Sequence, residues 1–152
     1  LEPLRPLLDL APIKVVQAEC SLLAPNAEMR AFCRERALGF VATGVLAHGI
    51  FAGQFTGKET FPEIDPMRAG PLFNPPMFEH AVAYARKLAE FAQDRGTTRE
   101  VLAIAWVLRQ TGVTCALLEP RDAQEARAWL KAGEIELSEA DANAMPDLLK
   151  ST

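Results

Sequence analysis

The sequence predicts an α/β fold in which about three parallel strands alternate with flanking helices. Short apolar runs, of which residues 40–42 are the clearest, are typical of strands that helices cover on both faces. Segments with helical periodicity separate these runs, so right-handed crossovers between parallel strands are expected. A glycine- and proline-rich stretch, residues 50–76, predicts a long loop after the second strand.

Length and composition favour one domain spanning residues 1–152. The chain is 49% hydrophobic and 24% charged, enough to bury about two-thirds of its unfolded surface. With 16 Lys and Arg against 20 Asp and Glu, the net charge of −4 argues against nucleic acid as a partner. No apolar run approaches the ~20 residues of a membrane span, and the N-terminal segment lacks the order of a secretion signal. We therefore expect no membrane partner and a cytoplasmic location.

The cysteines give no sign of a disulfide framework or a metal site. Cys20, Cys33 and Cys115 are widely spaced, and no Cys-x-x-Cys motif occurs. We expect buried, reduced thiols and no bound metal.

The first elements are a helix over Leu4–Leu10, which Pro12 ends, and a strand over Ile13–Gln17. The polar residues Gln17, Glu19 and Cys20 lie at or just beyond the end of this strand. In parallel α/β sheets, ligands bind at the carboxyl ends of strands.

The next helix is predicted over Ala27–Ala37, with Asn26 as its cap and Gly39 as its terminator. The apolar strand that follows ends in a turn, where Gly44 and Gly49 permit a close approach of the backbone to a ligand. These glycines could equally serve the geometry of the turn alone.

The long loop over residues 50–76 is expected to pack down as a lid or flap, because it carries four phenylalanines. A structural insertion with no role in binding is an equal alternative. The phenylalanines are Phe51, Phe55, Phe61 and Phe73.

The remaining elements follow from caps and periodicity. A helix over Met77–Arg95 stops at Gly96, and the capping box from Thr97 to Glu100 opens a helix over Val101–Gln110. The third strand covers Gly112–Leu118. Two last helices, over Ala123–Lys131 and toward Leu149, begin at the caps Asp122 and Ser138.

Several segments, taken in order, resemble the C-terminal part of an aldo-keto reductase. They read VVQAECSLL, FCRERALGFVATGVLAHGIFAGQFT, LAIAWVLRQTGVTCALLEPRDAQEARAWL and EIELSEADANAM. The resemblance implies that the three strands are similar to the sixth to eighth of a (β/α)8 TIM barrel, so the expected fold is a partial, TIM-barrel-like α/β domain. A complete barrel takes around 250 residues. In the family, the catalytic Tyr and its Asp, Lys and His companions come from earlier strands, and Tyr84, the only tyrosine, does not match that position.

The resemblance also implies which residues would face the family's cofactor, NADP. Gln17 matches the glutamine that holds the nicotinamide amide. The usual Tyr-Ser-Pro-Leu turn is replaced here, so that Thr43 and Gly44 stand where the family has the stacking ring and a phosphate-facing hydroxyl. Leu46 is retained, and His48 stands where the family often has Gln.

The adenosine-phosphate end departs further from the family pattern. Glu119 falls where the family has Gly or Lys, Glu125 where a polar or basic residue helps, and Trp129 where an Asn meets adenine. Arg121 is retained as a residue that can bind phosphate oxygens, because a guanidinium does so bidentately. Because two carboxylates face one arginine, we expect weak or absent NADP binding.

These observations favour an aldo-keto-reductase-like protein that has lost redox chemistry and binds a small molecule at the strand ends. Its pocket would combine Glu19, Cys20, His48, Glu119 and Arg121. A Cys beside a His can act as a nucleophile and its base, and His with Glu can do acid-base work. Each residue also has an ordinary explanation, because Cys20 is common in reductases and His48 occupies a tolerant loop position.

Two alternatives stay open. The chain could be the cofactor-side part of an NADPH-dependent carbonyl reductase, completed by self-association, by a complementing chain or by a missing N-terminal segment. Three strands of a barrel leave unpaired edges, so a homo-oligomer or a complementing partner is expected. The other alternative is a trimmed reductase with no independent role.

Overall fold

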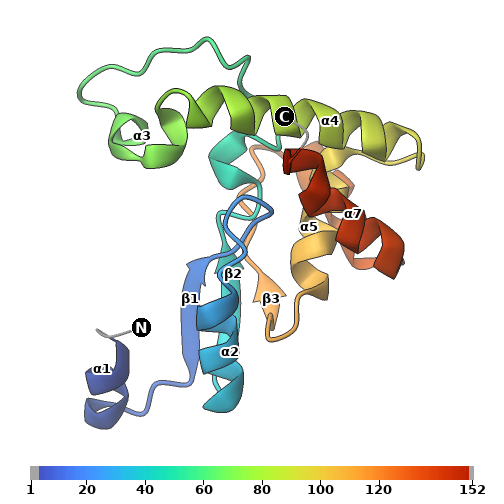
Figure 1. Ribbon diagram of the computed structural model, residues 1–152. Helices are drawn as coiled ribbons and strands as arrows, with labels where there is room; N and C mark the ends of the chain where they lie inside the picture. Colours follow the sequence, from blue (N-terminus) through green and yellow to red (C-terminus); the bar gives the residue numbers. More distant parts are fainter. Residues whose placement is uncertain (1–3, 151–152) are drawn as a thin grey trace.

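The computed structural model describes residues 4–150, and it has the predicted α/β architecture. Three parallel strands form one open sheet, and helices pack against one face of it and beyond its carboxyl end (Figure 1). The strands are β1 Val15–Glu19, β2 Gly39–Thr43 and β3 Cys115–Ala116. The α-helices are α1 Leu4–Leu10, α2 Ala27–Glu35, α3 Pro66–Ala69, α4 Met77–Gln93, α5 Arg99–Arg109, α6 Ala123–Leu130 and α7 Glu139–Lys150. Short 3-10 helices cover Ala47–Gly49, Pro71–Phe73 and Lys131–Gly133.

The strand order is β1-β2-β3, so each strand pairs with its neighbour in the chain. Val15 lies opposite Gly39 and Glu19 opposite Thr43, whereas β3 pairs through only two residues. Two further backbone bonds lengthen the β3 contact, since the amides of Thr114 and Leu117 donate to carbonyls of β2 at 2.9 and 2.8 Å. The carboxyl ends of all three strands therefore lie at one edge of the sheet.

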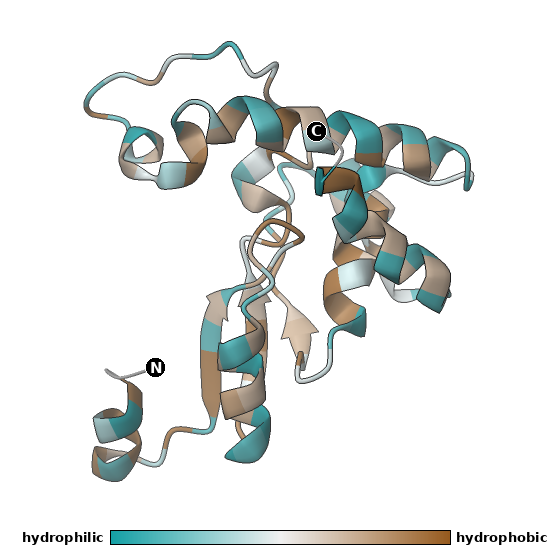
Figure 2. Cartoon of the chain, viewed as in Figure 1, coloured by the Kyte–Doolittle hydropathy of each residue, from teal (hydrophilic) through white to brown (hydrophobic). Residues whose placement is uncertain are grey.

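One face of this sheet is covered and the other is open. Phe40 and Ala42 point to the covered face, where α2 packs on β2 and α5 on β3, and both side chains are fully buried. On the opposite face, Val15 of β1 is 55% exposed and Leu117, just after β3, is 46% exposed. Figure 2 shows hydrophobic colour along β3 and the lower part of β1. We call this side the open face of the sheet.

A helical layer made by α4, α5 and α7 holds the rest of the core. The phenol of Tyr84 is buried there and donates a hydrogen bond to the carbonyl of Met145 at 2.9 Å. The indole of Trp106 donates to the carbonyl of Ala142 at 3.0 Å. These bonds join α4 and α5 to α7.

Three sequence predictions about element ends are wrong. Asn26 does not cap α2, because its backbone is left-handed (φ 48°) and its amide donates instead to the carbonyl of Glu19 at 2.9 Å. Gly39 does not end α2, because the chain leaves the helix through a left-handed Ala37 and Gly39 is already the first residue of β2. The cap of α5 is Thr98 instead of Thr97, since its hydroxyl accepts the amide of Val101.

The caps predicted for the last two helices are confirmed. The carboxylate of Asp122 accepts the amides of Gln124 and Glu125 at 2.8 Å each. The hydroxyl of Ser138 accepts the amide of Asp141 at 3.0 Å. Of the cysteines, Cys20 and Cys33 are buried as expected, but Cys115 is exposed, because it lies on the open face.

The loop between β2 and α4 packs down through its phenylalanines, as predicted. Phe55, Phe61 and Phe73 contact one another and Phe78 of α4, with ring centroids 5.3–6.0 Å apart. We call these four rings the phenylalanine cluster. Phe51 packs separately against Tyr84 at 5.6 Å. The loop is thereby held over the carboxyl ends of the strands (Figure 1).

Candidate functional site

A pocket of about 460 Å³ lies at the carboxyl ends of the strands, within the size range of small-molecule sites. Six of the residues predicted from the sequence as site residues are among those that line it. The lining consists of Gln17, Thr43, Gly44, Val45, Leu46, His48, Gly49, Ala52, Gln54, Met67, Leu117, Leu118, Glu119 and Trp129.

The ends of β1 and β2 form the first wall. Gln17 and Glu19 are on β1, opposite Val41 and Thr43 of β2. The chain turns sharply after Thr43 because Gly44 is left-handed (φ 59°), and a Cβ there would lie 3.2 Å from the Glu19 side chain. Both the left-handed backbone and this close approach therefore favour glycine at position 44.

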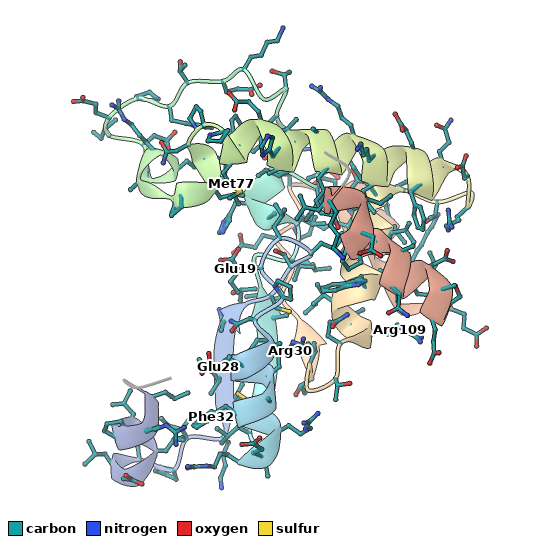
Figure 3. All side chains as sticks on the ribbon, in the orientation of Figure 1. Glu19, Glu28, Arg30, Phe32, Met77 and Arg109 are labelled. Carbon is teal, nitrogen blue, oxygen red and sulfur yellow. The ribbon has the colours of Figure 1, made fainter. Side chains whose placement is uncertain are left out.

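His48 projects from a strained turn at the edge of the pocket. Ala47 and His48 are both left-handed, with φ of 49° and 52°, which is uncommon for residues that carry a side chain. The imidazole Nε2 lies 3.6 Å from Oε1 of Glu19, and the ring packs edge-on to Phe73 at 6.2 Å. Figure 3 shows Glu19 near the carboxyl end of β1. The structure thus brings Glu19 and His48 together.

Cys20 lies apart from the pocket lining. Its side chain is fully buried, and the thiol donates to the carbonyl of Pro25 at 3.4 Å. Burial raises the pKa of the Cys20 thiol, although the nearby Arg30 guanidinium opposes this rise. A buried thiol with a raised pKa is a poor nucleophile. The structure therefore does not assemble the pair of Cys20 and His48 considered from the sequence.

Arg121 also lies outside the pocket lining, and it is engaged by a carboxylate. Its Nε donates to Oε1 of Glu125 at 2.9 Å and its backbone amide to Oε2 at 2.8 Å, while Nη2 also contacts Oε1. These hydrogen bonds lower the pKa of the Glu125 carboxyl and raise that of the guanidinium. Glu125 thus offsets the charge of Arg121 and would compete with a phosphate for its Nε and Nη2 donors.

The loop after β2 supplies lining residues that the sequence did not single out. Gln54 and Met67 complete the wall opposite the strands. The Gln54 amide lies against Gly49, a left-handed glycine (φ 95°) where a Cβ would collide with it. The sequence feature that could have indicated Gln54 is its polar amide between Gly53 and Phe55, in an otherwise apolar stretch.

A second, smaller hollow of about 330 Å³ adjoins the pocket and shares Ala52 and Trp129 with it. Glu100, Asp122 and Glu125 contribute to its walls. Across residues 4–150, no group of three or more His, Cys, Asp or Glu side chains is arranged to hold a metal ion. Within the same range, none of the helices has the length and apolar character needed to cross a membrane.

An open parallel sheet with a ligand-sized pocket at its carboxyl edge defines this molecule as part of a barrel-type α/β protein. The model of the aldo/keto reductase family matches residues 7–150. The chain belongs to this family.

Curated relatives and solved structures agree with this membership. The chain is 27% identical over 138 residues to the uncharacterized oxidoreductase YrpG of Bacillus subtilis, covering 87% of this chain and 39% of that protein. It is also 27% identical over 104 residues to the aldo-keto reductase yakc [NADP(+)] of Schizosaccharomyces pombe, covering 65% of this chain and 31% of that protein.

Two solved structures share the fold. The glycerol dehydrogenase AKR11B4 from Gluconobacter oxydans superposes with a TM-score of 0.80 at 25% identity, over 94% of this chain and 44% of that one. The thermostable aldo-keto reductase Tm1743 gives 0.58 at 20% identity, over 88% of this chain and 39% of that one. The chain thus spans less than half the length of each of these four proteins.

Proposed function

We propose that this chain is a small-molecule-binding member of the aldo-keto reductase family that does not carry out the family's redox reaction by itself. One observation carries the proposal. The pocket at the strand ends is lined by Glu119, and no lysine or arginine occurs among its described lining residues. A site for a dinucleotide needs cations or free backbone amides at the phosphates.

The contacts around the pocket support the same conclusion. The guanidinium of Arg121, which matches the family's phosphate partner, is bound to Glu125. Thr43 and Gly44 line the pocket where the family has a stacking ring and a hydroxyl. Aldo-keto reductases use NADP(H), but these residues do not fit its phosphate-bearing half. A compact ligand that touches Gln17 fits the 460 Å³ volume better.

Tyr84 does not supply the family's proton donor. Its phenol is buried in the helical layer and hydrogen-bonded to Met145, and burial raises its pKa above the ordinary value of 10.0. Tyr84 is not among the described residues that line the pocket, and the chain has no second tyrosine.

The proposal is tested by titrating the purified chain with NADPH while the fluorescence of Trp129 is followed. Trp129 lines the pocket, and replacing the buried Trp106 by Phe removes the other indole signal. We expect no saturable change up to millimolar NADPH. Saturable binding at micromolar NADPH would overturn the proposal. In that event, Glu119→Gly should tighten the binding if the carboxylate opposes the phosphate.

A second candidate is the cofactor-side part of an NADPH-dependent carbonyl reductase, completed by another copy or another polypeptide. The open face of the sheet favours it, since Val15 and Leu117 are exposed there. The superposition with a TM-score of 0.80 over only 44% of the glycerol dehydrogenase also supports it. Such a complex would bind NADPH and consume it with a carbonyl substrate, whereas the isolated chain would do neither.

A further inference from the structure

The carboxylate of Glu119 lies in the pocket wall without a partner. In the part of the chain that the structure describes, it forms neither an ion pair nor a hydrogen bond, although it lines the pocket directly. Glu125, six residues later, is by contrast neutralised by Arg121. No described side chain of the protein therefore competes with a ligand for the Glu119 carboxylate.

The other lining groups suit a ligand with a charged head and an apolar tail. Val45, Leu46, Met67 and Leu118 contribute apolar lining, and Glu119 and Trp129 line the same pocket. An indole attracts cations through its ring face. The side-chain carbonyls of the two lining glutamines can accept N–H donors from the same head group.

The nearest charged groups reinforce this preference. Glu19 lies 3.6 Å from the His48 imidazole at the rim. In the adjoining hollow, the carboxylate of Asp122 accepts the backbone amides of Gln124 and Glu125, and Arg121 is close enough to interact with its charge. Arg121 and Arg99 are nearby cations, but they face Glu125 and Glu100 at ion-pair distance. The region around the pocket is therefore electronegative.

We propose that the pocket binds a small amphiphilic organic cation of the alkylammonium class. Its ammonium group pairs with Glu119, and its alkyl chain lies along the apolar lining of Leu46, Met67 and Leu118. This inference rests on the proposed function, because it names the ligand class of the same pocket. An anionic molecule of equal size is disfavoured by Glu119.

The test compares three probes of equal length and different charge: hexylammonium, hexanol and hexanoate. Binding to the whole chain is measured by saturation-transfer NMR and by Trp129 fluorescence. We expect hexylammonium to bind most tightly and hexanoate most weakly. Glu119→Gln should weaken hexylammonium about fivefold and leave hexanol unchanged, as expected for loss of one solvent-accessible ion pair. Glu119→Lys should reverse the order and favour hexanoate.

Glu136→Gln is the matched control, because it removes one exposed carboxylate outside both hollows. It should leave all three affinities unchanged. Equal binding of the amine and the alcohol would overturn the cation site while the small-molecule pocket stands. If Glu119→Gln and Glu136→Gln weakened hexylammonium binding equally, the cation site would also be overturned. Such a result would mean that the affinity depends only on the net charge of the protein. Micromolar NADPH binding with no binding of any probe would overturn the proposed function itself.

Discussion

At the scale of one residue, the fold buries the titratable phenol of Tyr84. Burial raises the pKa of its phenol, so the unfolded chain releases this proton first as the pH rises. The stability that Tyr84 contributes is therefore complete below about pH 10 and decreases above it, by about 1.4 kcal/mol for each pH unit. Because the chain has a single tyrosine, tyrosinate absorbance reports Tyr84 alone.

We expect tyrosinate absorbance to appear together with alkaline unfolding, as followed by far-UV circular dichroism. Tyr84→Phe should cost about 1 kcal/mol at neutral pH, because the carbonyl of Met145 loses its donor, and should make the alkaline loss of stability less steep. Urea denaturation at pH 7 and pH 11 measures both effects. A tyrosinate signal that rises near pH 10 in the folded chain would contradict the burial of this phenol.

Arg30 illustrates how one side chain joins separate elements. It is buried on α2, and its Nη1 and Nε donate to the carbonyls of Thr111 at 2.6 Å and Pro25 at 3.0 Å (Figure 3). The contact with Thr111 ties α2 to the turn between α5 and β3. Gly112 in that turn is left-handed, and a Cβ there would lie 2.9 Å from the carbonyl of Arg30.

Arg30→Met should therefore destabilise the chain by about 2 kcal/mol, since two partly buried hydrogen bonds from a charged donor are lost. Arg34→Met on the exposed side of α2 is the matched control and should change stability by less than about 0.5 kcal/mol. Urea denaturation measures both. Similar losses in the two variants would mean that α2 is held to the β3 turn by other contacts.

At the scale of elements, the loop after β2 contributes residues both to the hydrophobic core and to the pocket lining. Phe61 contacts Phe73 at 5.3 Å and Phe78 at 5.5 Å, and Met67 of α3 in the same loop lines the pocket. Phe61→Ala should cost about 2 kcal/mol of local stability, because it removes one ring from the phenylalanine cluster. Amides of residues 54–75 should then exchange faster with deuterium.

The matched control in this loop is Ile64→Ala, because Ile64 is 92% exposed. It should leave the exchange unchanged. Binding of hexylammonium should weaken in Phe61→Ala alone, since Met67 lies in the loop whose packing this change loosens. Unchanged exchange in Phe61→Ala would mean that the loop is held without the cluster.

The alternation of strands and helices could be predicted from sequence because apolar runs and caps are local signals. Asp122 and Ser138 cap their helices as predicted, since nothing else competes for these side chains. Asn26 does not cap α2, because its backbone is left-handed and its side chain is oriented so that the amide donates to the carbonyl of Glu19. That carbonyl is seven residues away in the chain, so the bond can be foreseen only once β1 is placed.

The pocket was predictable only in part, for a similar reason. Gln17, Thr43 and Glu119 follow from the rule that parallel strands end at one edge. Met67 could not be predicted to line the pocket, because its position depends on how the phenylalanine cluster packs the loop that carries it. Nor did the sequence indicate that Arg121 would be held by Glu125, since that bond depends on the start of α6.

The whole molecule leaves one side of its sheet uncovered. Val15 and Leu117 are largely exposed on the open face, and Cys115 lies between them on β3. Among the described residues, β1 and β3 each have one neighbouring strand, so both edges carry unpaired backbone groups. Exposed edges of this kind are templates for pairing with another chain. Association should therefore be a property of the isolated polypeptide.

We expect the purified chain to show a concentration-dependent mass above that of one chain in light scattering. The double variant Val15→Lys with Leu117→Lys should shift the distribution toward one chain, because two charges would be buried without partners in any contact over the open face. Leu130→Lys is the control, since Leu130 is 71% exposed at the end of α6 and away from the sheet. Circular dichroism should match in all three proteins. A chain that is monomeric at every concentration would argue against self-association and leave a complementing polypeptide as the way to cover this face.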